Sequence, residues 1–227
     1  MLSVKKIYGD WIKERIFPIL FLLLVILHIL AKNYLAVILP NMGIEIIDQD
    51  LIAGLIFLSI IYFLGEIFKV GFKPRHYVIA FILAILSFIL NPLYSAFFYY
   101  DKLLHFTQSM LLSSLIFYMV GRNNIKLKWA LIITIFIMVG VGSVFELSEF
   151  GADTFLNWET QGVLSKTIQG KIGQLSLALD PLTDTNLDML FNLLGSISYS
   201  ILFVYEEYVH NKRRGSLRAV LNARSSV

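Results

Sequence analysis

The sequence contains no cysteine, and only 15% of its 227 residues are charged. The absence of cysteine excludes disulfide bonds, thiolate nucleophiles, iron–sulfur clusters and cysteine-based zinc sites. Soluble domains carry about 25% charged residues, so this chain has too few to cover a surface that faces water. The scarcity of charge therefore excludes an ordinary soluble domain.

Hydrophobic residues make up 57% of the chain and are collected in long runs. A bilayer core about 30 Å thick needs roughly 20 helical residues. Backbone polar groups in lipid must be satisfied within the segment, which favours helices. We therefore predict an all-α, polytopic membrane helical bundle, with residues 1–227 as one transmembrane domain. The six predicted transmembrane helices span residues 13–32, 51–70, 77–99, 102–120, 129–150 and 185–208.

Basic residues lie almost entirely on one side of these six spans. Of the 19 lysines and arginines, only four are expected on the opposite side: Lys32, Lys102, Lys166 and Lys171. The positive-inside rule then predicts a protein of the cytoplasmic membrane with both termini in the cytoplasm. This topology explains the net charge of +3, so membrane lipids are expected as partners and nucleic acid is not.

Two segments outside the predicted spans have distinct compositions. The basic segment 209–227 is expected to be a cytoplasmic tail that lies on anionic lipid. The outer loop 151–184 is far longer than an ordinary connection and mixes apolar with polar residues. Two interpretations of this loop stay open, a solvated connection and a lid over a cavity on the outer face.

Ionisable side chains are rare within the predicted spans, yet three spans carry them at the same end. On each span they are three or four residues apart and so share one helical face. They are Asp101 and His105, Glu146 and Glu149, and Asp184, Asp188 and Asn192. Because the last three spans alternate in direction, these groups should lie at one depth near the outer interface. The pattern predicts a single cluster between the three helices.

Several carboxylates together in a medium of low dielectric constant need a cation or shared protons. Carboxylate oxygens with one imidazole suit Mg²⁺, Mn²⁺, Ca²⁺ or Zn²⁺. We therefore predict a divalent metal site, with protonated carboxylates that pair with one another as the alternative. The predicted ligands are Asp101, His105, Glu146, Glu149, Asp184 and Asp188.

A second interpretation assigns some of these residues ordinary local roles. Asp101 is then an exposed helix cap, and Lys102 extends its ammonium to the membrane interface. Thr185 to Asp188 resembles a capping box, in which Asp188 closes the start of the last span.

The order of these residues resembles that in a known family. Asp-Lys-x-x-His-Phe from Asp101, Glu-x-x-Glu from Glu146 and Asp-x-x-x-Asp-x-x-x-Asn-x-x-Gly from Asp184 look like the YjdF-like family of inner-membrane proteins. They are more distantly similar to the VanZ-like family, which is associated with resistance to glycopeptide antibiotics of the teicoplanin type. The resemblance runs from about Tyr100 to Gly195 and implies a shared polar site, with no settled reaction.

Two classes of function follow from such a site. In the first, the protein is an enzyme that acts on a lipid or isoprenoid-phosphate headgroup with the help of the metal. His105 or Glu149 would then be the general base, and Lys102 would contact phosphate. In the second, the protein is a non-catalytic cation sensor or transporter, or the metal has a structural role.

Overall fold

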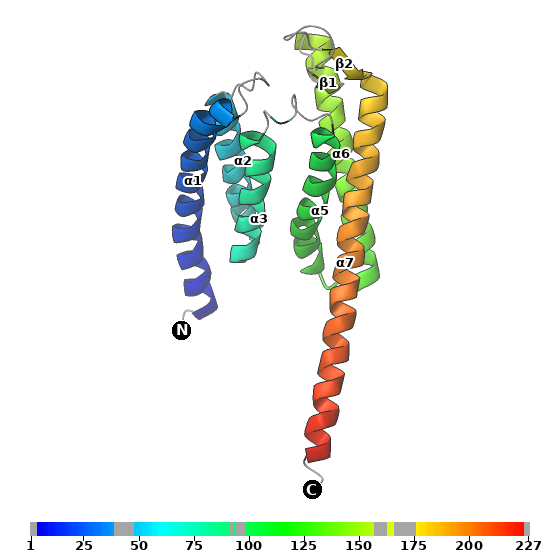
Figure 1. Cartoon of the computed structure of the whole chain (residues 1–227). Helices are drawn as coiled ribbons and strands as arrows, with labels where there is room; N and C mark the ends of the chain where they lie inside the picture. Colours follow the sequence, from blue (N-terminus) through cyan, green and yellow to red (C-terminus); the bar gives the residue numbers. More distant parts are fainter. Residues whose placement is uncertain are drawn as a thin grey trace.

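The structure, a computed structural model, is predominantly helical (Figure 1). It describes residues 4–38, 48–90, 93, 99–156, 163–165 and 176–224. The helices are α1 (Val4–Ile38), α2 (Asp48–Ile67), α3 (Pro74–Ala84), the π-helical segment η2 (Ile85–Ile89), α5 (Tyr100–Gly121), α6 (Leu127–Leu156) and α7 (Pro181–Arg224).

The helices form two groups, α1 to α3 with η2 and α5 to α7 (Figure 1). In the second group α5 and α7 run in the same direction and α6 runs in the opposite direction. The end of α6 therefore lies beside the starts of α5 and α7. These helix directions bring residues from three distant parts of the sequence to one end of the group.

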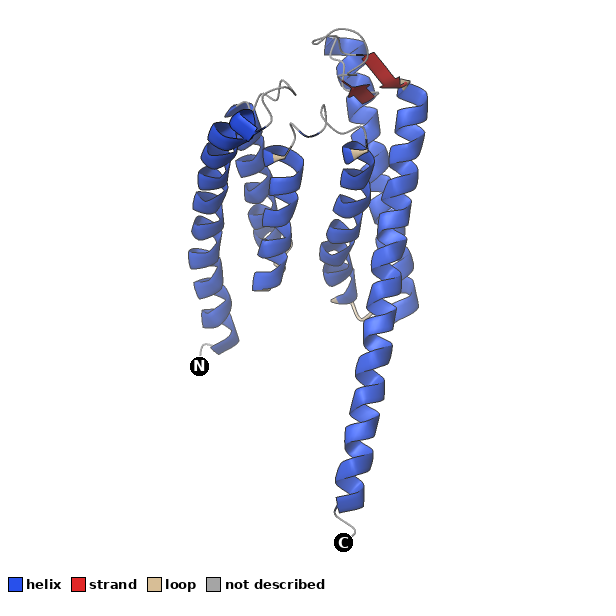
Figure 2. Cartoon of the chain, viewed as in Figure 1, coloured by secondary structure: helices blue, strands red, loops and turns tan. Residues whose placement is uncertain are grey.

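Two short strands lie at that same end (Figure 2). Strands β1 (Val163–Ser165) and β2 (Ser176–Leu179) pair in antiparallel fashion. The all-α prediction is correct for the helices and missed this small sheet, because strands of three and four residues carry too few positions for an alternating pattern. Residues 157–162 and 166–175 of the expected loop 151–184 lie outside the described residues.

Among the described residues, four helical segments are long and apolar enough to cross a membrane: Ile16–Tyr34, Tyr100–Gly121, Leu127–Leu156 and Pro181–Lys212. Two shorter apolar segments, Leu51–Ile67 and Pro74–Ile89, correspond to the second and third predicted spans. The number of six spans and the orientation of the termini stay predictions. Large apolar side chains point outward from these helices, among them Phe136 at 73% exposure, as a surface that faces lipid requires.

Helices α6 and α7 are both longer than the sequence pattern predicts. Helix α6 continues to Leu156, so Asp153, expected in a loop, is helical. Helix α7 begins at Pro181, where proline suits the first helical position. The backbone N–H of Thr183 donates to Asp180 Oδ1 at 3.0 Å, which caps the helix. Hydrogen bonds from the side chain and backbone of Thr183 lower the pKa of Asp180.

This earlier start changes the interpretation of Asp188. Because α7 begins at Pro181, Thr185 and Asp188 lie within the helix, and the capping-box interpretation is wrong. The third predicted span, 77–99, is helical in the structure up to Ile89. Pro92 predicts a kink in this span, because proline lacks a backbone N–H, but Asn91 and Pro92 lie outside the described residues.

Buried apolar side chains join the two helix groups. Leu24 of α1, Leu58 of α2 and Ala84 of α3 form a core that Leu115 of α5 completes. A second core lies nearer the start of α3, where Tyr118 of α5 packs against buried apolar residues. The Tyr118 hydroxyl also donates to the carbonyl of Gly71 at 2.8 Å, which ties α5 to the segment before α3.

Helices α5 and α7 approach closely at Gly195. A Cβ atom built there would overlap the carbonyl oxygen of Phe106 and would lie 2.9 Å from Cβ of Ser109. A backbone carbonyl cannot move aside as a flexible side chain can. Only glycine at this position therefore allows the two helices to remain in register.

We predict that Gly195→Ala destabilises the protein, because the added methyl group must push α5 and α7 apart. Overpacking of this kind costs about 1–3 kcal/mol. Gly140→Ala on α6 is the matched control, since a Cβ atom there meets nothing within 4 Å. Thermal unfolding in detergent should show a lower midpoint for Gly195→Ala alone. Equal midpoints for the two variants would contradict the close approach of these helices.

Candidate functional site

The ammonium group of Lys102 lies at the centre of a buried ionic cluster. It donates to Asp101 Oδ2 at 2.7 Å, to Asp188 Oδ1 at 2.6 Å and to Asp184 Oδ1. All four side chains are buried, with Lys102 only 4% exposed. The interpretations of Lys102 as an interfacial side chain and of Asp101 as an exposed cap are therefore wrong.

Helix direction explains why three aspartates gather here. Asp101 lies in the first turn of α5 and Asp184 in the first turn of α7. The N-terminal end of a helix carries partial positive charge and favours a carboxylate. Two parallel helices that start side by side thus offer two such ends, and Lys102 supplies a full positive charge between them.

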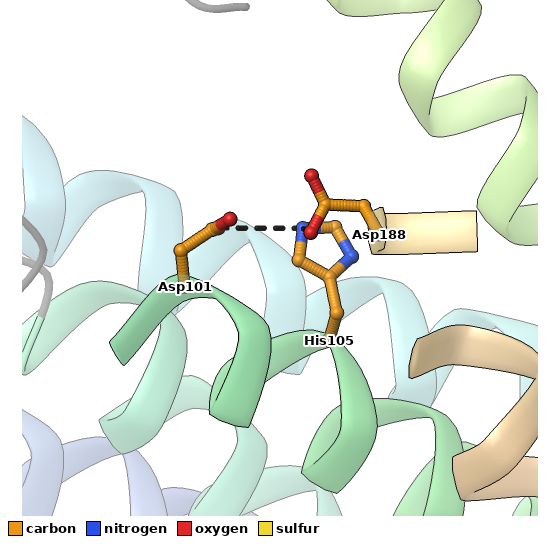
Figure 3. Close-up of side chains that lie close together, drawn as sticks. All are labelled: Asp101, His105 and Asp188. Carbon is orange, nitrogen blue, oxygen red and sulfur yellow. Dashed lines mark ion pairs between the residues drawn. The ribbon is translucent and has the colours of Figure 1, made fainter. Parts of the chain in front are cut away.

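His105 lies one turn below Asp101 and faces the same cluster (Figure 3). Its Nε2 atom is 3.4 Å from Asp101 Oδ1 and 3.5 Å from Asp188 Oδ1. One ligand atom from each of Asp101, His105 and Asp188 lies within 4.8 Å of the other two. Two carboxylates and an imidazole at this spacing can hold one metal ion.

A pair of polar residues positions the other side of the His105 ring. Asn192 Nδ2 lies 3.3 Å from His105 Nδ1. The Ser109 hydroxyl donates to Asn192 Oδ1 at 2.6 Å. Gly142 of α6 makes room for this amide, because a Cβ atom there would lie 2.7 Å from Asn192 Nδ2. All three helices of the second group therefore set the orientation of His105.

Helix α6 contributes Glu146 and Glu149 to the same end of the group. Glu146 is 4% exposed, and its Oε1 atom has no hydrogen-bond partner among the described residues. It lies within electrostatic range of His105 and Asp184 and forms a hydrogen bond with Thr185. Glu149 is half-buried and lines a neighbouring cavity.

This cavity has a volume of about 410 Å³ and lies between the two helix groups. The cluster side of its wall is polar, with Asp101, His105, Gln108, Glu149 and Asn192. The opposite wall is largely apolar and comes from α2, α3 and η2, with Phe57, Leu83 and Phe88 among its residues. The candidate ligands Asp101 and His105 are therefore accessible to a molecule that has both polar and apolar parts.

The structure brings the predicted site residues together with different degrees of contact. Asp101, Lys102, His105, Asp184, Asp188 and Asn192 form one connected network. Glu146 and Glu149 lie beside this network. Three of the six predicted ligands, Asp101, His105 and Asp188, lie close enough together to hold one metal ion. The carboxylate of Asp184 instead binds the ammonium of Lys102.

Sequence reasoning missed the central position of Lys102 and the wall that the first helix group supplies. Lys102 directly follows Asp101 in the sequence, and neighbours in sequence do not share a helical face. Nothing in the spacing indicates that the long lysine side chain reaches across to α7. Ser87, which accepts a hydrogen bond from Gln108 at 2.8 Å, likewise carries no recognisable motif.

We predict that Lys102→Met destabilises the protein strongly, because three buried aspartates lose their shared counter-charge. Removal of one partner from a buried ionic group costs about 3–5 kcal/mol. Added Mn²⁺ or Zn²⁺ should restore part of the lost thermal stability, since the carboxylates then need another cation. The exposed Lys126→Met on the α5–α6 connection is the control. An unchanged unfolding midpoint for Lys102→Met would contradict the cluster as described.

The comparisons with known proteins agree with a membrane protein. A family model described as "Predicted membrane protein (DUF2238)" matches residues 21–207, a range that includes every residue of the cluster. The comparisons with curated proteins and with solved structures found no match. The more specific resemblance to the YjdF-like and VanZ-like families stays a prediction. Because the family model covers most of the chain, the protein belongs to this family of predicted membrane proteins, DUF2238.

Proposed function

We propose that the protein binds a divalent cation through Asp101, His105 and Asp188 and presents it to an amphiphilic molecule in the adjoining cavity. The observation that carries this proposal is the convergence of these three side chains, from two helices, within 4.8 Å. Asp101 and His105 also line the cavity. A metal held there would have protein ligands on one side and room for water or substrate on the other.

The charge balance of the cluster supports a cation. Five carboxylates gather at this end of the helices, from Asp101, Glu146, Glu149, Asp184 and Asp188, whereas Lys102 and a protonated His105 supply at most two positive charges. Ionised groups away from water are costly unless they are paired. A divalent cation would offset most of the surplus negative charge. A mixed set of two carboxylates and one imidazole favours Mn²⁺ or Zn²⁺ over Mg²⁺ or Ca²⁺.

The tautomer of His105 matters for this binding. With Asn192 Nδ2 facing Nδ1, the ring accepts at Nδ1 and carries its proton on Nε2, toward the carboxylates. Coordination through Nε2 requires the proton on Nδ1 instead. Rotation of the Asn192 amide would present its oxygen to that proton, and the Ser109 hydroxyl can accept from the amide in turn. Asn192 and Ser109 can thus satisfy both tautomers.

The shape of the cavity favours a lipid or isoprenoid-phosphate headgroup as the molecule bound. Its polar side would face the cation, and its apolar wall would contact a hydrocarbon chain. In an enzymatic reaction the metal would supply Lewis acidity. Glu149 would be the general base, because it lines the cavity and lies outside the three-ligand set. Lys102 would hold the aspartates in position, since its ammonium already binds three carboxylates.

The bias of basic residues supports a site at the outer face of the cytoplasmic membrane, with both termini in the cytoplasm. The cluster lies at the start of α7, and the basic C-terminal part of this helix extends away from it (Figure 1). A site at that depth would meet lipid headgroups of the outer leaflet.

We expect the purified protein to carry one equivalent of divalent metal per chain and Asp101→Asn/Asp188→Asn to carry none. Replacing both carboxylates with amides removes two of the three ligand groups at little change in volume. Elemental mass spectrometry of protein purified without chelators measures the metal. Glu207→Gln, an exposed carboxylate in the second half of α7 and remote from the cluster, is the control and should retain the metal.

Two outcomes test metal binding and the proposed role in lipid chemistry separately. Failure of the wild type to bind Mn²⁺ or Zn²⁺, even when either is added in excess, would refute the metal centre and leave a network closed by Lys102 and shared protons. Bound metal with no change in membrane lipid composition between wild type and Glu149→Gln would favour a non-catalytic cation sensor or a structural metal site.

The absence of cysteine allows a direct test of orientation. Single cysteines introduced as Ser165→Cys and Asn211→Cys report on the two ends of the helices. With a membrane-impermeant maleimide added to intact cells, we expect labelling at position 165 and none at position 211 until the cells are lysed. The reverse pattern would place the cluster at the cytoplasmic face.

A further inference from the structure

A second cavity lies at the other end of the helices, remote from the acidic cluster. Its volume is about 530 Å³, and its walls come from α3, α5 and α7. Arg75 and Arg122 line it, together with the aromatic residues Phe117, Tyr118, Tyr199 and Phe203. The proposed cation site uses none of these residues.

The two arginines are placed to receive an anion. Arg75 lies in the first turn of α3, where the helix end adds partial positive charge. Arg122 directly follows the last residue of α5. Both side chains are exposed. Within the part of the chain that the structure describes, neither forms an ion pair with a carboxylate, although Glu206 also lines the cavity.

The neighbouring His76 does not accept a hydrogen bond from the Arg75 guanidinium. Nε of Arg75 is 3.3 Å from Nε2 of His76, but Nδ1 of that ring already accepts the backbone N–H of Lys73 at 3.0 Å. A neutral imidazole has only one acceptor nitrogen, so Nε2 carries the proton and cannot accept from Arg75. The guanidinium therefore keeps its hydrogen-bonding capacity for a ligand.

The inner wall of the cavity suits hydrocarbon. The ring centroids of Phe117 and Phe203 are 4.5 Å apart, and Tyr199 lies 5.9 Å from Phe117, so α5 and α7 present a continuous aromatic surface. Tyr118 closes one side and is held by its hydrogen bond to Gly71. Lys73 adds positive charge nearby, with Nζ 5.9 Å from the centre of the Tyr118 ring.

We propose that this cavity binds an anionic phospholipid, with the headgroup phosphate between Arg75 and Arg122 and an acyl chain against the aromatic wall. The candidate span of α5 ends at this level, at Gly121, and the ends of membrane spans are where the phosphate groups of a bilayer lie. Basic pockets between membrane helices are suited to anionic headgroups, and planar guanidinium groups match phosphate geometry. The lipid would bridge the two helix groups at an end where α3 meets α5 and α7.

The test is a titration of the full chain in neutral detergent with phosphatidylglycerol, followed by native mass spectrometry. Each arginine near an anionic headgroup contributes about fivefold in affinity, so Arg75→Gln/Arg122→Gln should bind roughly thirtyfold more weakly. Lys126→Gln/Lys128→Gln is the matched control, because it removes the same charge from the α5–α6 connection and the first turn of α6, outside the cavity, and should bind as the wild type does. Phosphatidylcholine should bind weakly to all three proteins.

Two results would overturn the proposal. Equal loss of phosphatidylglycerol in the arginine and lysine variants would mean attraction to general surface charge. Inorganic phosphate that displaces the lipid, or binds equally well with the same dependence on the arginines, would identify a free-phosphate site. If the double variant does not fold, Arg122→Gln alone, an exposed change beyond the end of α5, should still bind roughly fivefold more weakly.

Discussion

The polar end of this protein depends on the ion pairs between the Lys102 ammonium and three buried aspartates. The ammonium bridges Asp101 of α5 with Asp184 and Asp188 of α7, and all four groups are buried. Without that positive charge, three aspartates at two adjacent helix starts would repel one another away from water. The same contacts link α5 to α7, so one buried ionic group both neutralises the site and holds its two supporting helices together.

The rest of the site follows from how closely the helices pack below this group. Gly195 allows α5 and α7 to approach until a larger residue would meet the Phe106 carbonyl. Gly142 allows α6 to approach the Asn192 amide. With both helices in place, Asn192 and Ser109 orient the His105 ring toward Asp101 and Asp188. Two glycines that bind nothing themselves thus determine the geometry of the candidate metal ligands.

The molecule has opposite electrostatic character at its two ends. Carboxylates gather where α5 and α7 begin, and arginines line a cavity where α5 ends. Each end also has a cavity with an apolar wall, formed where the two helix groups meet. This arrangement provides two separate amphiphilic sites, one suited to a cation and its ligand and one suited to an anionic headgroup. The two sites share the helices α3, α5 and α7.

The sequence by itself determined that the chain is a helical membrane protein and that its acidic residues share one end of three helices, because apolar run length and three- or four-residue spacing are local properties. It therefore predicted the membrane helices and placed Asp101, His105 and Asp188 on facing surfaces. Only the tertiary structure decided that Lys102 lies among the aspartates. It also revealed that α2 and α3 complete the cavity. These features depend on long side chains and on contacts between distant helices, which no local spacing encodes.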